Sequence, residues 1–198
     1  MALHRAHPVR RQRFGLRAAA EGHLVAGAAH AFGGAVALAY WGVPRATIDL
    51  DINVFLSQDE RTRVLDSLAP LFPIPNRADA ERQLEHAAQV RLRWGTMPVD
   101  LFFSNSDFHD AMAGRSRVVD YVGTPIPVLS SEDLILCKAA FNRPKDWLDI
   151  ETIVAVQQHL DEAYLHHWLD AFADPEDERL ARVDRLLRER QGRGPERA

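Results

Sequence analysis

Apolar and polar side chains alternate along "ATIDLDINVFL" between Ile48 and Val54, which is the pattern of a half-buried β-strand. Upstream, "HAFGG" predicts a short buried strand that ends at a glycine pair, and "AVALAYWG" predicts a helix. Pro44 ends that helix, because the residue before a proline avoids helical geometry. Downstream, "SQDERTRVLDSLAPLF" predicts a helix with Ser57 as its N-cap and Glu60 at the capping-box spacing.

The next segments predict a second part of the sheet. A proline-rich and polar loop, "PIPNRADAE", leads into "AQVRLRW" and "MPVDLFF", two apolar runs on either side of Gly95-Thr96. That spacing is typical of a hairpin with a two-residue turn. "DFHDAMAGRSRVVDY" predicts a helix. "TPIPVL" predicts a short edge strand, because proline has no N–H to give to a central ladder.

From Ser130 onward the apolar spacing is helical in four successive segments, "SSEDLILCKAAF", "PKDWLDIETIVAVQQHL", "DEAYLHHWLDAF" and "PEDERLARVDRLLRER". Ser130 is a predicted N-cap, and Pro144 stands at a favourable first helical position. The expected fold class is therefore α+β, with a mixed twisted sheet flanked by helices and a helical C-terminal part. The expected divisions are a basic arm, a core that opens with a helix over 16–28, a helical region packed on the core, and a tail, over residues 1–15, 16–129, 130–192 and 193–198.

Composition fits a globular protein of one sizeable core, with 198 residues, 46% apolar and 26% charged. The only cysteine, Cys137, excludes a disulfide framework and a cysteine-rich zinc site. No apolar run reaches the roughly 18 residues of a membrane span, and no signal-peptide segment stands out, so we expect no membrane partner and a cytoplasmic location. Residues 1–17 hold five arginines and no acid although the net charge is −4. Such an arm is either a solvated or disordered end, or a phosphate-attracting segment.

Two aspartates, Asp49 and Asp51, stand one residue apart in the predicted strand and so project to the same side of it. Like charges this close repel each other unless a cation lies between them. Mg²⁺ favours oxygen ligands of this kind, while a solvent-facing edge strand is the alternative explanation. Asp100 lies in a second apolar strand, "PVDLFF". If the two strands are neighbours, three carboxylates meet, which is enough to hold metal ions for phosphoryl transfer.

Phosphate-binding groups precede the aspartates. Gly33 and Gly34 stand just before a predicted helix, where backbone N–H groups and the helix dipole favour a phosphate. Arg45 and Thr47 follow that helix, and arginine is a donor that holds phosphates in a bidentate manner. The order and spacing of these groups, more than any one of them, indicate a nucleotide.

The stretch "GGAVALAYWGVPRATIDLDI" resembles the signature of the DNA-polymerase-β-like nucleotidyltransferase superfamily. More narrowly, "GVPRATIDLDI" and "EDLILCKAAFNRPKDWLDIETIV" are similar to the AbiEii/MenT branch, the nucleotidyltransferase toxins of bacterial type IV toxin–antitoxin systems and their relatives. The resemblance covers roughly residues 30–155. It departs from the pattern of many members at Ala35, where they have a serine or threonine whose hydroxyl touches a phosphate.

The resemblance implies a polymerase-β-like fold and a role for each matching residue. Gly33 and Gly34 would approach the triphosphate, with Arg45 and Thr47 beside it. Metal and catalytic roles fall on Asp49, Asp51 and Asp100, the last of which would bridge a metal or act as base. Lys138 would contact the phosphates as a further catalytic residue, and Asp146 or Asp149 would be an acid near the nucleotide.

The function implied is Mg²⁺-dependent transfer of a nucleoside monophosphate from an NTP to a hydroxyl acceptor, with Mn²⁺ as another usable metal. In the toxin branch the acceptor is a tRNA 3′ end, and a cognate antitoxin protein would be a partner. Two alternatives to this function stay open. One is a non-catalytic binding protein with this fold, and the other is a small-molecule nucleotidyltransferase of the antibiotic-modifying kind.

Overall fold

The computed structural model describes residues 28–56, 60–69, 74, 76–172 and 177–192. By its internal contacts the chain forms two compact units. One holds the described residues up to Val36 together with Ala46–Leu129, and the other holds Ala37–Arg45 and the described residues from Ser130 onward. Of the expected divisions, the arm over 1–15 and the tail over 193–198 lie outside the described residues, as does nearly all of the predicted helix over 16–28.

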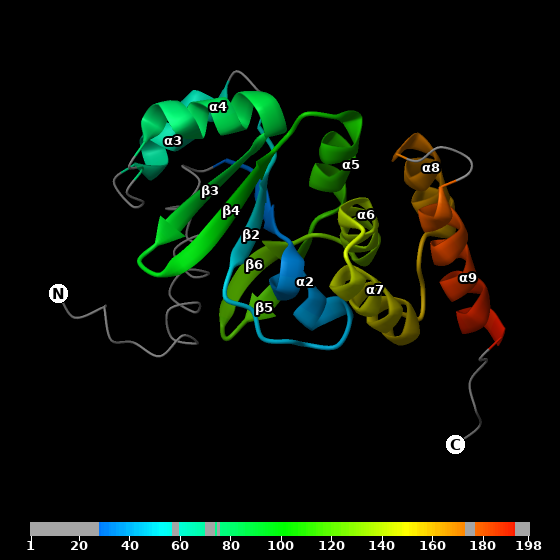
Figure 1. The fold of residues 1–198 in the computed structure, drawn as a ribbon. Coiled ribbons are helices and arrows are strands. Elements are labelled where there is room, and N and C mark those ends of the chain that lie inside the picture. The colour runs from blue at the N-terminus through cyan, green and yellow to red at the C-terminus, as the bar shows by residue number, and fades with distance from the viewer. Residues whose placement is uncertain (1–27, 57–59, 70–73, 75, 173–176, 193–198) are drawn as a thin grey trace. The chain divides into compact units, whose positions relative to one another are not determined.

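The first unit is built on a six-stranded mixed sheet in the order β3-β4-β2-β1-β6-β5 (Figure 1). The β2 strand runs parallel to β4 and β1 parallel to β6, while the other neighbours are antiparallel. The strands are β1 (His30–Phe32), β2 (Leu50–Val54), β3 (Gln89–Trp94), β4 (Met97–Phe103), β5 (Arg117–Tyr121) and β6 (Thr124–Val128).

Every second residue of β2 is apolar and fully buried, namely Leu50, Ile52 and Val54. On the other face Asn53 is buried as well, and only Asp51 is half-buried. Burying one such aliphatic side chain stabilises the fold by about 1.5–3 kcal/mol. The predicted hairpin over β3 and β4 is also confirmed, because Trp94 pairs with Met97 across a two-residue turn. Gly95 in that turn has φ +60°, a conformation that glycine adopts readily.

Among the described residues, three helices lie wholly in the first unit: α3 (Arg61–Leu68), α4 (Arg77–Ala87) and α5 (Asp107–Arg115). Helix α4 corrects the sequence-based interpretation, which treated "PIPNRADAE" as a loop. Asn76 caps this helix by accepting a hydrogen bond from the Asp79 backbone N–H at 3.1 Å. Only Ala80 and Leu84 are buried along it, so its apolar pattern was too sparse to reveal a helix. The predicted cap of α3, Ser57, lies outside the described residues.

Strands β5 and β6 correct two further expectations. The helix predicted over 107–121 ends at Arg115, and "RVVDY" forms β5, since paired β-branched valines favour a strand. The β6 strand is internal and not at an edge, because it lies between β1 and β5. Pro125 and Pro127 are tolerated there because β1 pairs with β6 only at Val128, so no β1 carbonyl needs the N–H that either proline lacks.

The second unit is helical, as expected for the C-terminal part. It contains most of α2 (Gly34–Trp41), whose first three residues belong to the first unit, and α6 (Ser131–Phe141), α7 (Pro144–Val156), α8 (Glu162–Phe172) and α9 (Glu178–Gly192). Ser130 caps α6 as predicted, accepting from the Asp133 N–H, and Pro144 opens α7. None of the described helices is long and apolar enough to cross a bilayer.

The core of the second unit is a set of aliphatic side chains with 0–3% exposure from four helices: Leu134, Ile135, Leu136, Ile150, Ile153, Val154, Leu165, Leu169, Val183 and Leu187. The segment Ala37–Arg45 joins this core through Leu38, which is fully buried, and through a hydrogen bond of 2.8 Å from the Gln157 side chain to the Trp41 carbonyl. This unit is therefore assembled from two stretches of chain that are distant in the sequence.

Candidate functional site

The glycine pair of the first unit lies directly against Asp51. The Gly33 N–H donates to the Asp51 carbonyl at 2.9 Å, which joins the end of β1 to β2. Gly34 begins α2 with φ +49°, and a Cβ atom at this position would stand 1.8 Å from Oδ2 of Asp51. Only glycine fits here, because a side chain would overlap the carboxylate and strain the backbone.

The three predicted carboxylates occupy neighbouring strands. Asp51 of β2 and Asp100 of β4 are direct partners in a parallel pair, so their side chains project to the same face of the sheet. Asp49 immediately precedes β2 and lies two residues before Asp51, and it accepts a hydrogen bond from the Thr47 hydroxyl. The structure thus brings together Asp49, Asp51 and Asp100, with Gly33, Gly34 and Thr47 beside them.

A residue that sequence reasoning missed, Arg91, completes this site. It is the antiparallel partner of Asp100 in the β3–β4 hairpin. Its Nε donates to one carboxylate oxygen of Asp100 at 2.7 Å and a terminal nitrogen donates to the other at 2.5 Å. The hydrogen bonds to Asp100 raise the pKa of the Arg91 guanidinium above its usual range, and the nearby charges of Asp49 and Asp51 add to this effect.

The donor set suits a hard divalent cation in chemistry and placement, because all three candidate ligands are carboxylates on one face of one sheet. Among the described residues, however, no three acidic, histidine or cysteine side chains are arranged so that they could hold a metal ion as they stand. At least two of the three carboxylates are already engaged by neighbouring side chains. Asp100 gives both oxygens to Arg91, and Asp49 is engaged by Thr47. A metal here requires local rearrangement of these side chains.

The remaining predicted residues form a separate buried cluster, the Asp149 cluster, within the second unit. Lys138 of α6 is 5% exposed and its Nζ lies 2.6 Å from Oδ2 of Asp149 in α7. Arg45 holds the same carboxylate in a bidentate manner, with contacts of 3.0 and 2.9 Å. Burial acts to raise the pKa of Asp149, but the hydrogen bonds from Arg45 and Lys138 prevail and keep it below its usual range.

Asp146 extends this cluster at the start of α7. It accepts from the Arg143 side chain at 2.6 and 3.1 Å and from the Arg143 backbone N–H at 3.2 Å, so its carboxylate satisfies the backbone N–H of the N-cap residue of α7. Oδ1 of Asp146, which accepts the 3.1 Å hydrogen bond from Arg143, also lies 4.0 Å from Nζ of Lys138. The cluster therefore contains three cations and two carboxylates. Sequence reasoning missed Arg143, although its place immediately before Pro144 is a signal for an N-cap.

The fold of the chain is that of a nucleotidyltransferase. Among solved structures, the chain is similar to the antibiotic-resistance factor ANT(2'')-Ia, with 14% identity over 93% of this chain and 92% of that chain and a TM-score of 0.51. An antigenic nucleotidyltransferase-like protein from Paracoccidioides brasiliensis aligns at 12% identity over 91% and 89% of the two chains, with a TM-score of 0.49. The sequence matches no protein-family model, and comparison with curated proteins finds no match.

The likeness to ANT(2'')-Ia confirms the predicted fold class. The resemblance to the nucleotidyltransferase superfamily as a family stays a prediction. The narrower resemblance to the AbiEii/MenT branch stays a prediction. The same is true of the roles predicted for the site residues.

Proposed function

We propose that this protein transfers a nucleoside monophosphate from an NTP to a hydroxyl acceptor. The observation that carries the proposal is the position of Asp51, which lies against the glycine pair on one side and pairs with Asp100 on the other. The chain thus holds two carboxylates beside backbone that only glycine can form, on a nucleotidyltransferase fold. A phosphate can approach such backbone closely, because no side chain stands in its way.

Asp49, Asp51 and Asp100 would hold the metal, with Mg²⁺ as the expected ion and Mn²⁺ as an alternative. When bound, such an ion neutralises charge on the triphosphate and lowers the pKa of an attacking hydroxyl. Asp100, the buried carboxylate of the site, would either bridge a metal or take the proton of the acceptor hydroxyl. The hydroxyl oxygen then bonds to the α-phosphorus, the bond from that phosphorus to the bridging oxygen breaks, and pyrophosphate leaves with the electron pair.

In the Asp149 cluster, Lys138 and Arg45 have different roles in the proposed binding of a nucleotide. Lys138 is buried and bound to Asp149, so it acts by holding that carboxylate in place. Arg45 is 37% exposed, so of the two cations that hold Asp149 it is the one with surface open to a ligand phosphate. Direct contact of Lys138 with the nucleotide phosphates, which the resemblance implies, would require Lys138 to leave a 2.6 Å ion pair in a buried position.

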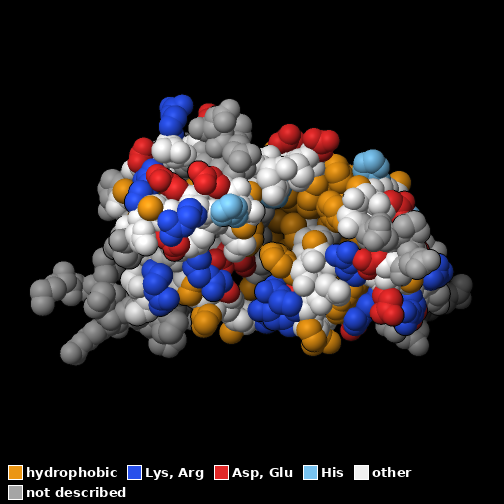
Figure 2. Space-filling model, turned by 45° about the horizontal axis from the view of Figure 1, so that its top comes forward, with side chains coloured by type: hydrophobic (Ala, Val, Ile, Leu, Met, Phe, Trp, Pro, Cys, Tyr) orange, Lys and Arg blue, Asp and Glu red, His pale blue; other side chains and the backbone are white. Residues whose placement is uncertain are grey.

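The acceptor is the finer part of the proposal. A tRNA 3′ end, together with a cognate antitoxin as protein partner, follows from the AbiEii/MenT resemblance. A hydroxylated antibiotic is the second candidate and is prompted by the name of the neighbour ANT(2'')-Ia. On the face drawn in Figure 2, basic and acidic side chains are interspersed, so charge on that face does not favour a nucleic acid over a small molecule.

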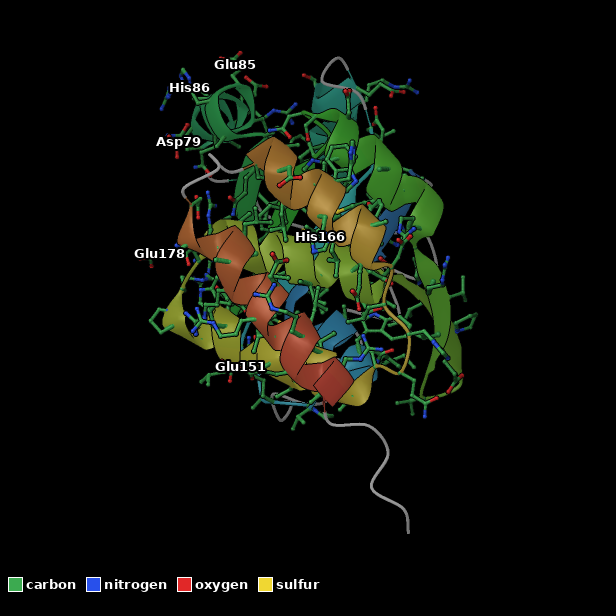
Figure 3. The ribbon with its side chains drawn as sticks, turned by 90° about the vertical axis from the view of Figure 1, so that its right-hand side faces the viewer. Asp79, Glu85, His86, Glu151, His166 and Glu178 are labelled. Carbon is green, nitrogen blue, oxygen red and sulfur yellow. The ribbon has the colours of Figure 1, made fainter. Side chains whose placement is uncertain are left out.

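The test is incubation of the full chain with each α-labelled NTP and Mg²⁺, with total tRNA or a panel of hydroxylated antibiotics as acceptor. We expect label to move to one acceptor, and the double variant Asp49→Asn/Asp51→Asn to abolish the transfer. The control is Glu85→Gln, which removes one exposed carboxylate from α4, a helix that carries none of the site residues (Figure 3). Metal-dependent NTP binding without transfer to any acceptor would favour the non-catalytic alternative, and loss of both would refute the proposal.

A further inference from the structure

We propose that Arg91 competes with the metal for Asp100. Its guanidinium occupies both oxygens of that carboxylate and has to release them before a divalent cation can bind there. Arg91 therefore lowers the metal affinity of the site. This inference rests on the proposed function, because it presumes that Asp100 is a metal ligand.

The geometry leaves no vacant oxygen on Asp100 for a second cation. The two contacts, at 2.7 and 2.5 Å, form a bidentate fork that uses each oxygen once. The Asp100 side chain is only 4% exposed, so it can be approached only through the small open part of its surface. The Arg91 guanidinium lies against that carboxylate. A metal ion and Arg91 would therefore have to bind the same two oxygens of Asp100.

Charge points to the same competition. Arg91 interacts with the charges of Asp49 and Asp51 in addition to its direct pair with Asp100. It is thus a cation already seated among the three carboxylates that would otherwise repel one another. A divalent cation in the same place would repel the guanidinium at short range, which favours one occupant over both.

Arg91 can leave Asp100 without disturbing the surrounding structure, because 59% of the surface of its side chain is exposed. The guanidinium can turn into solvent by rotation of its own side chain while the β3–β4 pairing stays in place, since that pairing uses backbone groups. The guanidinium regains hydration in this movement, because water replaces the carboxylate as its hydrogen-bond partner.

Arg93 provides a matched control on the same strand. It lies two residues after Arg91 and its side chain is exposed, but it donates to the Thr96 carbonyl at 3.0 Å and not to an acid of the site. Arg93→Gln removes the same charge from the same strand without opening Asp100. A difference between Arg91→Gln and Arg93→Gln then reports the contact with Asp100 and excludes a general effect of lowering the positive charge of β3.

The experiment is titration of the full-length protein with Mn²⁺ alone, followed by electron paramagnetic resonance of the free ion, without nucleotide. We expect Arg91→Gln to bind Mn²⁺ at least tenfold more tightly than the wild type, Arg93→Gln to stay within twofold, and Asp51→Asn to bind much more weakly. Arg91→Lys keeps the charge but cannot form the fork, and we expect it to lie between wild type and Arg91→Gln.

Equal or weaker Mn²⁺ binding by Arg91→Gln, with the wild type still binding, would overturn the competition alone and leave the metal site standing. Absence of Mn²⁺ binding in the wild type and in every variant would refute the metal site together with the competition. A readout in the unaltered protein guards against a misfolded variant. Addition of Mg²⁺ has to shift the Nε–H resonance of Arg91 and leave that of Arg93 in place, and an unmoved Arg91 resonance contradicts the inference.

Discussion

At the scale of single residues, the site depends on Gly34 having no Cβ atom. Gly34 lets the chain turn into α2 with φ +49° while the Asp51 carboxylate fills the space that a side chain would occupy. An identical backbone requirement exists at Gly95, with φ +60°, but there a Cβ would meet nothing within 4 Å. Comparing substitutions at Gly34 and Gly95 therefore distinguishes the free-energy cost of backbone strain from the cost of displacing Asp51.

We predict that Gly34→Ala and Gly95→Ala share a loss of about 1 kcal/mol in unfolding free energy from the left-handed backbone. Gly34→Ala also pushes the Asp51 carboxylate away, so Mn²⁺ affinity falls at least tenfold in this variant only. Chemical unfolding and Mn²⁺ titration measure the two effects. Equal metal binding by the two variants would show that Asp51 is not constrained by Gly34.

At the scale of elements, the hairpin places the cation of the site. A two-residue turn at Gly95-Thr96 fixes which residues face each other, and counting back from it sets Arg91 opposite Asp100. The sequence therefore contained the signal for Arg91, although it was not used. The sequence pattern assigns Asp51 and Asp100 to two short apolar strands but leaves open whether these strands are neighbours. The structure shows that they pair directly.

Other elements show what local pattern cannot reveal. The prolines of β6 favoured an edge position, but which strands pair is decided by contacts between residues far apart in the sequence. Here β6 pairs with β1 through Phe32 and Val128, which are 96 positions apart. Helix α4 buries too few residues to give a helical period. In the Asp149 cluster, Arg45 and Asp149 are 104 residues apart, so their ion pair could not follow from spacing alone.

Helix α6 carries Lys138, and its N-cap is a further element that can be tested. Ser130 accepts from the Asp133 N–H at 3.1 Å and donates to the Asp133 carboxylate at 2.6 Å, both in a buried position. We predict that Ser130→Ala costs roughly 1–2 kcal/mol of unfolding free energy, because it leaves buried groups unsatisfied. The exposed cap of α4 is the comparison, and Asn76→Ala costs less, about 0.5–1 kcal/mol. Urea denaturation measures both, and a larger loss for Asn76→Ala would contradict the explanation.

At the scale of the whole molecule, one carboxylate ties distant parts of the chain into the second unit. Asp149 of α7 binds Lys138 of α6 and Arg45 of the segment Ala37–Arg45. These contacts favour the ionised form of Asp149, whose pKa lies below its unfolded value of 3.8. The stabilisation is therefore complete above about pH 4 and is lost as the pH falls through the lower pKa of the folded state.

We predict that the unfolding free energy of the wild type falls with decreasing pH below about 4 and that Asp149→Asn shows a flatter decline. At neutral pH this variant is less stable by roughly 3 kcal/mol, because two cations lose their anion. Asp170→Asn on α8, an exposed carboxylate, is the control and changes little. Urea denaturation from pH 7 to 2 measures the profiles, and parallel profiles for wild type and Asp149→Asn would show that Asp149 does not contribute this dependence.

The division of the second unit into two stretches of chain has a consequence for its synthesis. Ala37–Arg45 leaves the ribosome before the 84 or so residues of Ala46–Leu129, and only then do the helices that bury Leu38 begin to emerge. At about 5–20 residues per second, this apolar segment waits roughly 4–17 s without its final neighbours. During that interval the nascent protein exposes apolar surface that is buried in the folded protein. We therefore expect chaperones to bind this segment during synthesis.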